Sequence, residues 1–254
     1  VEAAQRPITI RDLLTHTAGV NYGWGTALAA WQQAGIVGWY FAGDKESMRD
    51  KVRRMAALPQ AAQPGQQFVY GYNTDILGAL VEHLSGQNLE DFLRQQLFVP
   101  LQMRDTYFFV PPEQQARPSA VYAMTDSGLQ RQPTVQLAAA IPENFFYGQG
   151  HYLQGQVAGA RSHSGGAGAV STAADYARFL EMLRRGGELD GVRILGRKSV
   201  ELMTTNHLSA EVEYARPGSG FGLGFNVLMD VGQVGQLGSV GSYGWGGAYH
   251  STYW

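Results

Sequence analysis

The sequence contains no cysteine, which excludes disulfide bonds and a thiolate nucleophile and leaves the compartment, cytoplasm or periplasm, open. Charged residues are few, at 16%, and the formal net charge of −2 gives no indication of a nucleic-acid partner. No apolar run approaches the roughly 18 residues that a membrane-spanning helix needs. The six histidines show no H-E-x-x-H or other metal-ligand spacing. We therefore expect no metal, cofactor or membrane span, and the oligomeric state stays open.

The content of hydrophobic and aromatic residues is typical of a folded protein. Hydrophobic residues make up 44% of the sequence and aromatic residues 11%, enough for a sizeable core in one large domain or two small ones. The 33 glycines predict many tight turns and close backbone approaches. The sequence begins at Val1 without a signal-peptide pattern and ends at Trp254 inside an alternating run. We interpret it as an internal piece of a longer protein.

A tyrosine stands directly before the clearest helix pattern in the chain. Tyr70 and Gly71 follow a short apolar approach, and Asn73 or Thr74 is expected to cap the helix, which Gly86 ends in a left-handed conformation. The apolar face of this helix consists of Ile76, Leu80 and Leu84, with Leu77 and Val81 beside them. A side chain on this loop is rigidly placed, so Tyr70 is either a packing residue or a reactive group.

Three runs decide between these interpretations: FVYGYNTDILG at 68–78, LVEHLSG at 80–86 and LFVPLQMRDTYFFVP at 97–111. Together they resemble the second motif of the serine β-lactamase and penicillin-binding-protein family, most closely its class C-like esterase branch, family VIII. The resemblance implies that Tyr70 helps to move the proton of a nucleophilic serine. Many relatives have Tyr-x-Asn here, whereas this chain has Tyr72 at the third position and Asn73 one residue later. The resemblance implies substrate contacts for both residues, and the departure favours esters over lactams.

Further motifs extend the resemblance over nearly the whole chain. The run ITIRDLLTHTAG at 8–19 resembles a family loop in which the histidine, here His16, is architectural. The glycine-rich run at 164–172 lacks the Lys-Ser/Thr of a phosphate-binding loop and resembles a close-packed family turn that leads into a helix. Trp245-Gly246-Gly247 matches the third motif of the esterase branch, which implies a substrate-binding role for these three residues. In relatives the next main-chain N–H, here that of Ala248, forms half of an oxyanion hole.

The resemblance implies acyl transfer through a serine in a Ser-x-x-Lys motif at the start of a helix. None of the serines in this sequence has a lysine three residues later. We therefore expect the nucleophile to precede Val1 in the parent protein, and the chain as given to be inactive. The expected function of the parent is hydrolysis of a small-molecule carboxylic ester through an acyl-enzyme. Two alternatives stay open: a β-lactam or D-Ala peptide hydrolase, and a non-catalytic binding or assembly protein.

The expected fold is α/β of the α+β type, with an antiparallel sheet flanked by helices and a separate helical lobe. We expect one incomplete domain over residues 1–254, with the helical lobe at about 9–165 and the sheet side at about 166–254. The local predictions are a capping box at Thr9, a helix capped by Asp44, a helix at 89–97, a helix capped by Ser171 or Thr172, and strands at 221–229 and 243–254. The aromatic segment 21–43 either lines the substrate cleft or packs between lobes.

Overall fold

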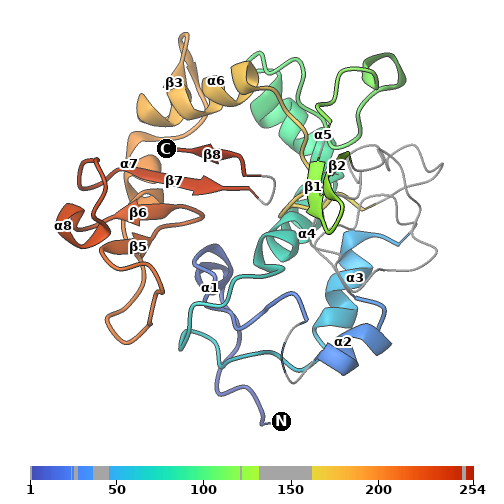
Figure 1. Cartoon of the computed structure of the whole chain (residues 1–254), viewed down its shortest axis with the longest axis vertical. Helices are drawn as coiled ribbons and strands as arrows, with labels where there is room; N and C mark the ends of the chain where they lie inside the picture. Colours follow the sequence, from blue (N-terminus) through green and yellow to red (C-terminus); the bar gives the residue numbers. More distant parts are fainter. Residues whose placement is uncertain are drawn as a thin grey trace.

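A computed structural model describes residues 2–23, 25, 28–36, 46–120, 122–131, 162–247 and 250–254, apart from the side chain of residue 123. Parts of the sequence predictions lie outside these ranges: the expected cap Asp44, the expected oxyanion donor Ala248, and residues 24, 26–27 and 37–43 of the aromatic segment. The four-stranded sheet lies to the left of helix α4 in Figure 1, and helices α2 and α3 lie below and to the right of α4.

The first half of the described chain is helical. Its helices are α1 (Ile10–Leu14), α2 (Leu28–Gln33), α3 (Met48–Met55), α4 (Asn73–Ser85) and α5 (Leu89–Leu93), followed by the π-helical turn η2 (Arg94–Phe98) and the 3-10 turn η3 (Pro112–Gln114). The capping box at Thr9 is confirmed: the Thr9 hydroxyl accepts from the Asp12 N–H, and the Asp12 carboxylate accepts from the Thr9 N–H. Helix α3 is capped by Ser47, whose hydroxyl accepts from the Asp50 N–H. Asp44 is therefore not the residue that caps it.

Helix α4 differs from its prediction at its start and on its buried face. Neither Asn73 nor Thr74 caps it: Tyr72 holds the N-cap position without a side-chain bond, while Gly86 ends the helix at φ 72° as predicted. The buried positions are Asn73, Asp75, Gly78 and Ala79, whereas Leu84 of the expected apolar stripe is 74% exposed. The glycine-rich turn at 164–166 packs against this face of α4. The segments that contact α4, rather than the hydropathy of its own residues, therefore determine which side of the helix is buried.

The second half of the chain contains the main sheet. Its elements are α6 (Ala173–Arg184), β3 (Glu188–Leu189), β4 (Val192–Arg193), α7 (Arg197–Met203), β5 (Ser219–Phe221), β6 (Asn226–Leu228), α8 (Val231–Val234), β7 (Tyr243–Gly246) and β8 (Thr252–Tyr253). The four-stranded sheet has the antiparallel order β5-β6-β7-β8, and a separate hairpin is formed by β1 (Tyr122–Thr125) and β2 (Gly128–Arg131). Helix α6 is capped by Thr172, one of the two caps that the sequence predicted.

Both predicted long strands are hairpins instead. The run 221–229 turns between Phe221 and Asn226, which pair with each other. Gly224 has φ 97°, and a Cβ on Gly222 would lie 2.2 Å from the Met203 carbonyl oxygen, so glycine permits the turn. The run 243–254 likewise folds back, because Trp245 pairs with Tyr253. The alternation of apolar with smaller or polar residues continues through each turn, so this pattern alone cannot distinguish a hairpin from one long strand.

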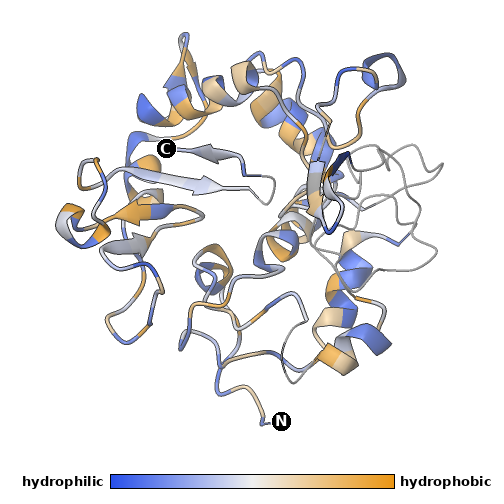
Figure 2. Cartoon of the chain, viewed as in Figure 1, coloured by the Kyte–Doolittle hydropathy of each residue, from blue (hydrophilic) through white to orange (hydrophobic). Residues whose placement is uncertain are grey.

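Two hydrophobic clusters form the core. One joins α1, α2, α3 and the start of α4, and includes Trp31, Met48 and Tyr72. The other joins α5 and the segment to Phe108 with α6, α7 and Phe225 in the turn between β5 and β6. This second cluster crosses the expected boundary near residue 165, although the division into lobes stays a prediction. Helix α3 contains strongly hydrophilic and strongly hydrophobic residues (Figure 2), and it buries Met48 and Met55.

The aromatic segment contributes to packing where the structure describes it. Trp31 is fully buried, stacks on Tyr72 with ring centroids 5.7 Å apart and donates its indole N–H to the Pro59 carbonyl.

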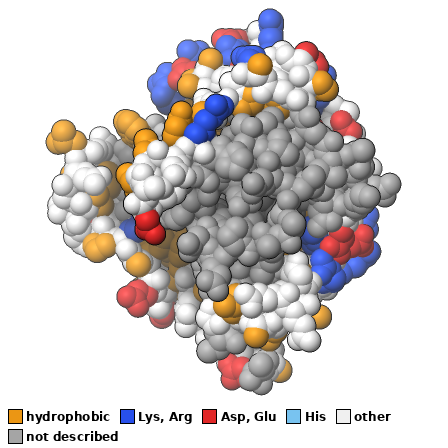
Figure 3. Space-filling view, turned by 45° about the vertical axis from the view of Figure 1, so that its right-hand side comes forward, with side chains coloured by type: hydrophobic (Ala, Val, Ile, Leu, Met, Phe, Trp, Pro, Cys, Tyr) orange, Lys and Arg blue, Asp and Glu red, His pale blue; other side chains and the backbone are white. Residues whose placement is uncertain are grey.

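Charged side chains of both signs lie close together in small groups in the view of Figure 3. Within the described ranges, no helix is both long and apolar enough to cross a membrane.

Candidate functional site

Tyr70 lies on the loop that enters α4, and its side chain is 41% exposed. The loop runs against the chain that follows α1, so closely that a Cβ on Gly71 would lie 2.4 Å from both the Val20 carbonyl oxygen and the Asn21 Cα. Glycine is therefore required here by a close backbone approach rather than by a left-handed φ. This contact fixes the path of the chain on the C-terminal side of Tyr70.

Trp245 meets Tyr70 across 175 residues of sequence. Its indole Nε1–H donates to the Tyr70 hydroxyl oxygen at 3.3 Å, and the two ring centroids are 5.4 Å apart. Because indole is only a donor, the phenol oxygen accepts this bond. The structure thus brings the predicted second and third motifs together at one phenol oxygen.

The glycines after Trp245 lie at the exposed end of β7. Gly246 is the last residue of the strand, and the Gly247 N–H donates to the Ser251 carbonyl at 2.7 Å in the turn toward β8. Both glycines are exposed, which leaves their backbone accessible beside Trp245. Ala248, the expected oxyanion donor, lies outside the described residues, so its role stays a prediction.

Two residues that the sequence analysis did not assign to the site contact the Trp245 ring. The Arg216 guanidinium carbon lies 4.9 Å from the centroid of this ring, within the range of a cation–π interaction. Phe221 presents its edge to the same ring at 5.3 Å. Arg216 belongs to no motif and no periodic pattern, and only the tertiary structure reveals its position.

His16 lies behind Tyr70 and is only 4% exposed. Its ring centroid is 4.5 Å from that of Tyr70 and 5.6 Å from that of Phe221. Burial lowers the pKa of His16 to about 4, so the imidazole is neutral at physiological pH. His16, which was expected to be an architectural residue, therefore packs directly against the Tyr70 ring.

Asn73 and Tyr72 do not occupy the positions expected of substrate-binding side chains. Both are fully buried; Tyr72 packs between Trp31 and Tyr22, with centroid distances of 5.7 and 4.8 Å. The Asn73 amide Nδ2 lies 2.9 Å from His16 Nδ1 and 3.1 Å from the carbonyl oxygens of Val20 and Val69. Direct substrate contact by either side chain would require this packing to open, so the expectation is corrected.

Asp75 is a buried titratable group that the sequence analysis missed. It is fully buried, and its Oδ1 accepts from the Ser164 hydroxyl at 2.5 Å and from the Gly166 N–H at 3.3 Å. Burial raises its pKa to about 6, although these two hydrogen bonds act in the opposite direction. The aspartate on α4 thereby ties the glycine-rich turn to the helix that follows Tyr70.

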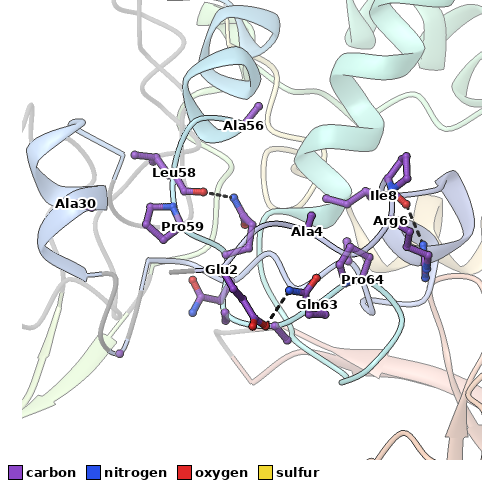
Figure 4. A pocket seen from close by; sticks show the side chains of 17 residues that line it. Glu2, Ala4, Arg6, Ile8, Ala30, Ala56, Leu58, Pro59, Gln63 and Pro64 are labelled. Atoms are coloured by element: carbon purple, nitrogen blue, oxygen red, sulfur yellow. Dashed lines mark hydrogen bonds between the residues drawn. The ribbon is translucent and has the colours of Figure 1, made fainter.

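A hollow of about 1330 Å³ lies elsewhere, beside the N-terminal segment and the chain after α3 (Figure 4). Tyr70 and Trp245 are not among its lining residues. Three of its polar lining residues are already paired: Gln63 donates to Glu2 at 2.9 Å, and Arg6 forms a two-pronged ion pair at 2.7 and 2.8 Å with Asp12, which does not line the hollow. In the part of the chain that the structure describes, no group of three or more histidine or acidic residues is arranged to hold a metal ion.

Comparison with known proteins identifies the family of the chain. The family model described as beta-lactamase matches residues 1–254. The chain belongs to the beta-lactamase family. Its helices and antiparallel sheets form a β-lactamase-like fold, as expected from the sequence. The structure of EstCE1, a hydrolase with promiscuous acyltransferase activity, matches with a TM-score of 0.80 and 29% identity, over 98% of this chain and 64% of that one.

Curated relatives in this β-lactamase-like family of hydrolases include a named esterase. Esterase EstB of Burkholderia gladioli is 29% identical over 267 residues, covering 97% of this chain and 61% of EstB. Protein Rv1367c of Mycobacterium tuberculosis (strain H37Rv) is 31% identical over 268 residues, covering 99% of this chain and 59% of that protein. The chain thus spans less than two thirds of the length of each of these relatives.

Proposed function

We propose that the whole protein hydrolyses small-molecule carboxylic esters through an acyl-enzyme, with Tyr70 as the group that moves the proton of the nucleophilic serine. The observation that carries this proposal is the exposed Tyr70 phenol with the Trp245 indole N–H 3.3 Å from its oxygen. The similarity to esterase EstB favours an ester as the substrate.

The proton transfers balance over two half-reactions. Tyr70 takes the proton of the serine hydroxyl while the serine oxygen attacks the ester carbonyl carbon, and the C–O bond to the alcohol breaks as Tyr70 returns the proton to it. A water molecule then attacks the acyl-enzyme, losing its proton to Tyr70, which passes it to the departing serine. The 254 residues contain no Ser-x-x-Lys motif, so the proposal requires this pair in the remainder of the whole protein.

We propose that the third motif contacts the substrate around its carbonyl group. Trp245, Gly246 and Gly247 would contact the substrate, and the main-chain N–H of Ala248 would donate to the oxyanion. Tyr72 and Asn73 are left out of the substrate contacts because both side chains are fully buried.

The test begins with Tyr70→Phe in the whole protein and p-nitrophenyl butyrate as the substrate. We expect the acylation rate, measured as the pre-steady-state release of p-nitrophenol, to fall about 100-fold or more, the usual scale for loss of a general base. Tyr122→Phe is the matched control, because Tyr122 has a comparable exposure of 54% and lies on β1. Its rate should stay within about twofold of wild type.

Three results would redirect the proposal. Wild-type rates in Tyr70→Phe would remove this residue from the mechanism. Cleavage of a chromogenic cephalosporin or a D-Ala-D-Ala peptide, but of no ester, would establish the lactam or peptide alternative. A whole protein without Ser-x-x-Lys and without turnover of any of these substrates would favour the non-catalytic binding alternative.

A further inference from the structure

We propose that His16 and Asn73 are positioning residues that fix the orientation of the Tyr70 phenol. This inference rests on the proposed function of Tyr70, but the arrangement it describes can be measured without any turnover. Neither residue reaches the substrate side of the phenol: both are buried behind it. They act through their contacts with the chain on either side of the tyrosine and with its ring.

The Asn73 side chain connects two separate loops. Its Nδ2 group points at His16 Nδ1 at 2.9 Å and at the carbonyl oxygens of Val20 and Val69, each at 3.1 Å. Val69 directly precedes Tyr70, and its N–H donates to the His16 carbonyl at 2.7 Å. The peptide groups before Tyr70 are thus held by His16 on one side and by Asn73 on the other.

His16 also contacts the Tyr70 ring directly. The centroids are 4.5 Å apart with an interplanar angle of 36°, so a displaced imidazole would leave the inner face of the phenol unsupported. The backbone of His16 has φ 55°, a left-handed conformation that non-glycine residues adopt infrequently. Such backbone strain persists where the surroundings over-determine it, and here its effect is to direct the imidazole at Tyr70.

The Asn73 amide serves several buried acceptors at once. Its two N–H donors are shared among His16 Nδ1 and the carbonyl oxygens of Val20 and Val69, whereas its own Oδ1 is buried and has no hydrogen-bond partner among the described residues. An apolar residue of similar volume would leave these three acceptors buried without a donor. The amide at this position therefore connects His16 to the loop that leads to Tyr70.

The same contacts dictate the protonation of His16. Because the Asn73 amide donates to Nδ1, this nitrogen must be unprotonated and the imidazole proton must lie on Nε2. Burial lowers the pKa of His16, which agrees with a neutral ring at neutral pH. Detection of the Nε2–H tautomer by NMR would therefore report the contact between the Asn73 amide and His16 Nδ1.

The kinetic test compares Asn73→Asp and His16→Asn with Thr15→Val in the whole protein. Asn73→Asp keeps the shape but replaces the donor by an acceptor, and asparagine tolerates the positive φ of residue 16. We expect both variants to lower kcat for p-nitrophenyl butyrate by about 10- to 100-fold, with KM within about threefold, as for a displaced catalytic group. Thr15 is a buried residue of the same loop that bonds to Arg11 and Thr17, so Thr15→Val should lower the melting temperature and keep kcat within about twofold.

Nitrogen-15 NMR of the imidazole gives a readout that does not depend on catalysis. At pH 7 we expect the Nε2–H tautomer in the wild type and in Thr15→Val, and an Nδ1–H tautomer in Asn73→Asp, where the carboxylate accepts. The ring signals of Tyr70, assigned with Tyr70→Phe, should shift in His16→Asn and Asn73→Asp but not in Thr15→Val. These NMR results without any ester turnover would uphold the arrangement and reject the proposed function.

Two outcomes would overturn the inference. One is a wild-type His16 that carries a proton on Nδ1 at pH 7, which can be measured even if a variant does not fold. The other is a folded His16→Asn or Asn73→Asp protein that keeps wild-type kcat and unshifted Tyr70 signals.

Discussion

Tyr70 and Trp245 meet at a single hydrogen bond, but different interactions hold them in place. Tyr70 is supported from behind by buried polar groups, His16 and Asn73, and by a backbone contact at Gly71. Trp245 is supported by the strand pairing of β7 with β8 and by Arg216 and Phe221 around its ring.

This difference indicates which side of the site tolerates change. Buried hydrogen bonds with specific donors and acceptors fix one orientation, and their loss is costly because the remaining partner stays buried. Strand pairing uses the backbone, so it survives a change of side chain, and the exposed rim around Trp245 can vary. We expect the Tyr70 side to determine whether the chemistry occurs and the Trp245 side to determine which substrate is accepted.

The largest expected effect is on the Tyr70 side, in Gly71→Ala. The new Cβ would lie 2.4 Å from backbone atoms of Val20 and Asn21, which cannot move without separating the two loops. We expect a loss of about 3 kcal/mol or more in the free energy of unfolding, measured by urea denaturation. Gly246→Ala is the control on the other side, because its Cβ would find its nearest neighbour at 3.5 Å, an ordinary contact. Equal losses in the two variants would contradict the comparison.

The next effect is a pH dependence that separates His16 from Asp75. The pKa of His16 is lowered from 6.5 to about 4, so the unfolded state takes up this proton first and stability is lost as pH falls from 6.5 through 4. The pKa of Asp75 is raised from 3.8 to about 6, so the folded state takes up this proton first and stability is gained over nearly the same range. Each contribution is on the order of 3 kcal/mol, and the two nearly cancel in the wild type.

Removing one group should therefore reveal the other. Unfolding by urea between pH 4 and pH 6.5 should show His16→Asn becoming more stable on acidification and Asp75→Asn becoming less stable. Asp12 contributes little to this window, because the hydrogen bond from Arg6 lowers its pKa from 3.8 to about 2, and its stabilisation is lost between these two values, below pH 4. Parallel pH profiles for the two variants would show that these groups do not titrate differently in the folded state.

A smaller effect is expected on the Trp245 side. In the whole protein, Trp245→Ala should change the ratio of kcat/KM values between short and bulky p-nitrophenyl esters by about tenfold, which corresponds to roughly 1.4 kcal/mol. Trp245→Phe keeps a ring without the N–H donor and isolates the hydrogen bond to Tyr70 from the shape of the site. An unfolded Trp245→Ala protein would indicate a packing role instead.

The smallest effect is expected for Arg216→Gln. The guanidinium is exposed above the Trp245 ring, and exposed cation–π contacts contribute about 0.5–1 kcal/mol. Thermal unfolding should therefore show a loss of less than about 1 kcal/mol. A loss above roughly 2 kcal/mol would mean that the sheet side depends on a specific side-chain contact as strongly as the Tyr70 side does.

Local sequence signals predicted several helix ends but not the surroundings of the helices. The capping box at Thr9, the cap at Thr172 and the stop at Gly86 are properties of a few adjacent residues, so the sequence contains them in full. The hairpin between Phe221 and Asn226 was missed because alternation continues across the turn. The buried face of α4 was missed because the turn at 164–166, far away in sequence, selects it.

The sequence by itself determined the family, the two motifs and the identity of Tyr70 and Trp245-Gly246-Gly247 as candidate site residues, because each motif is a short, contiguous run. Only the tertiary structure decided that Asn73 turns inward to His16 instead of toward a substrate, and that Arg216 lies over Trp245. The physical reason is that burial and hydrogen-bond partners arise between segments distant in sequence. Spacing within one segment carries no information about them.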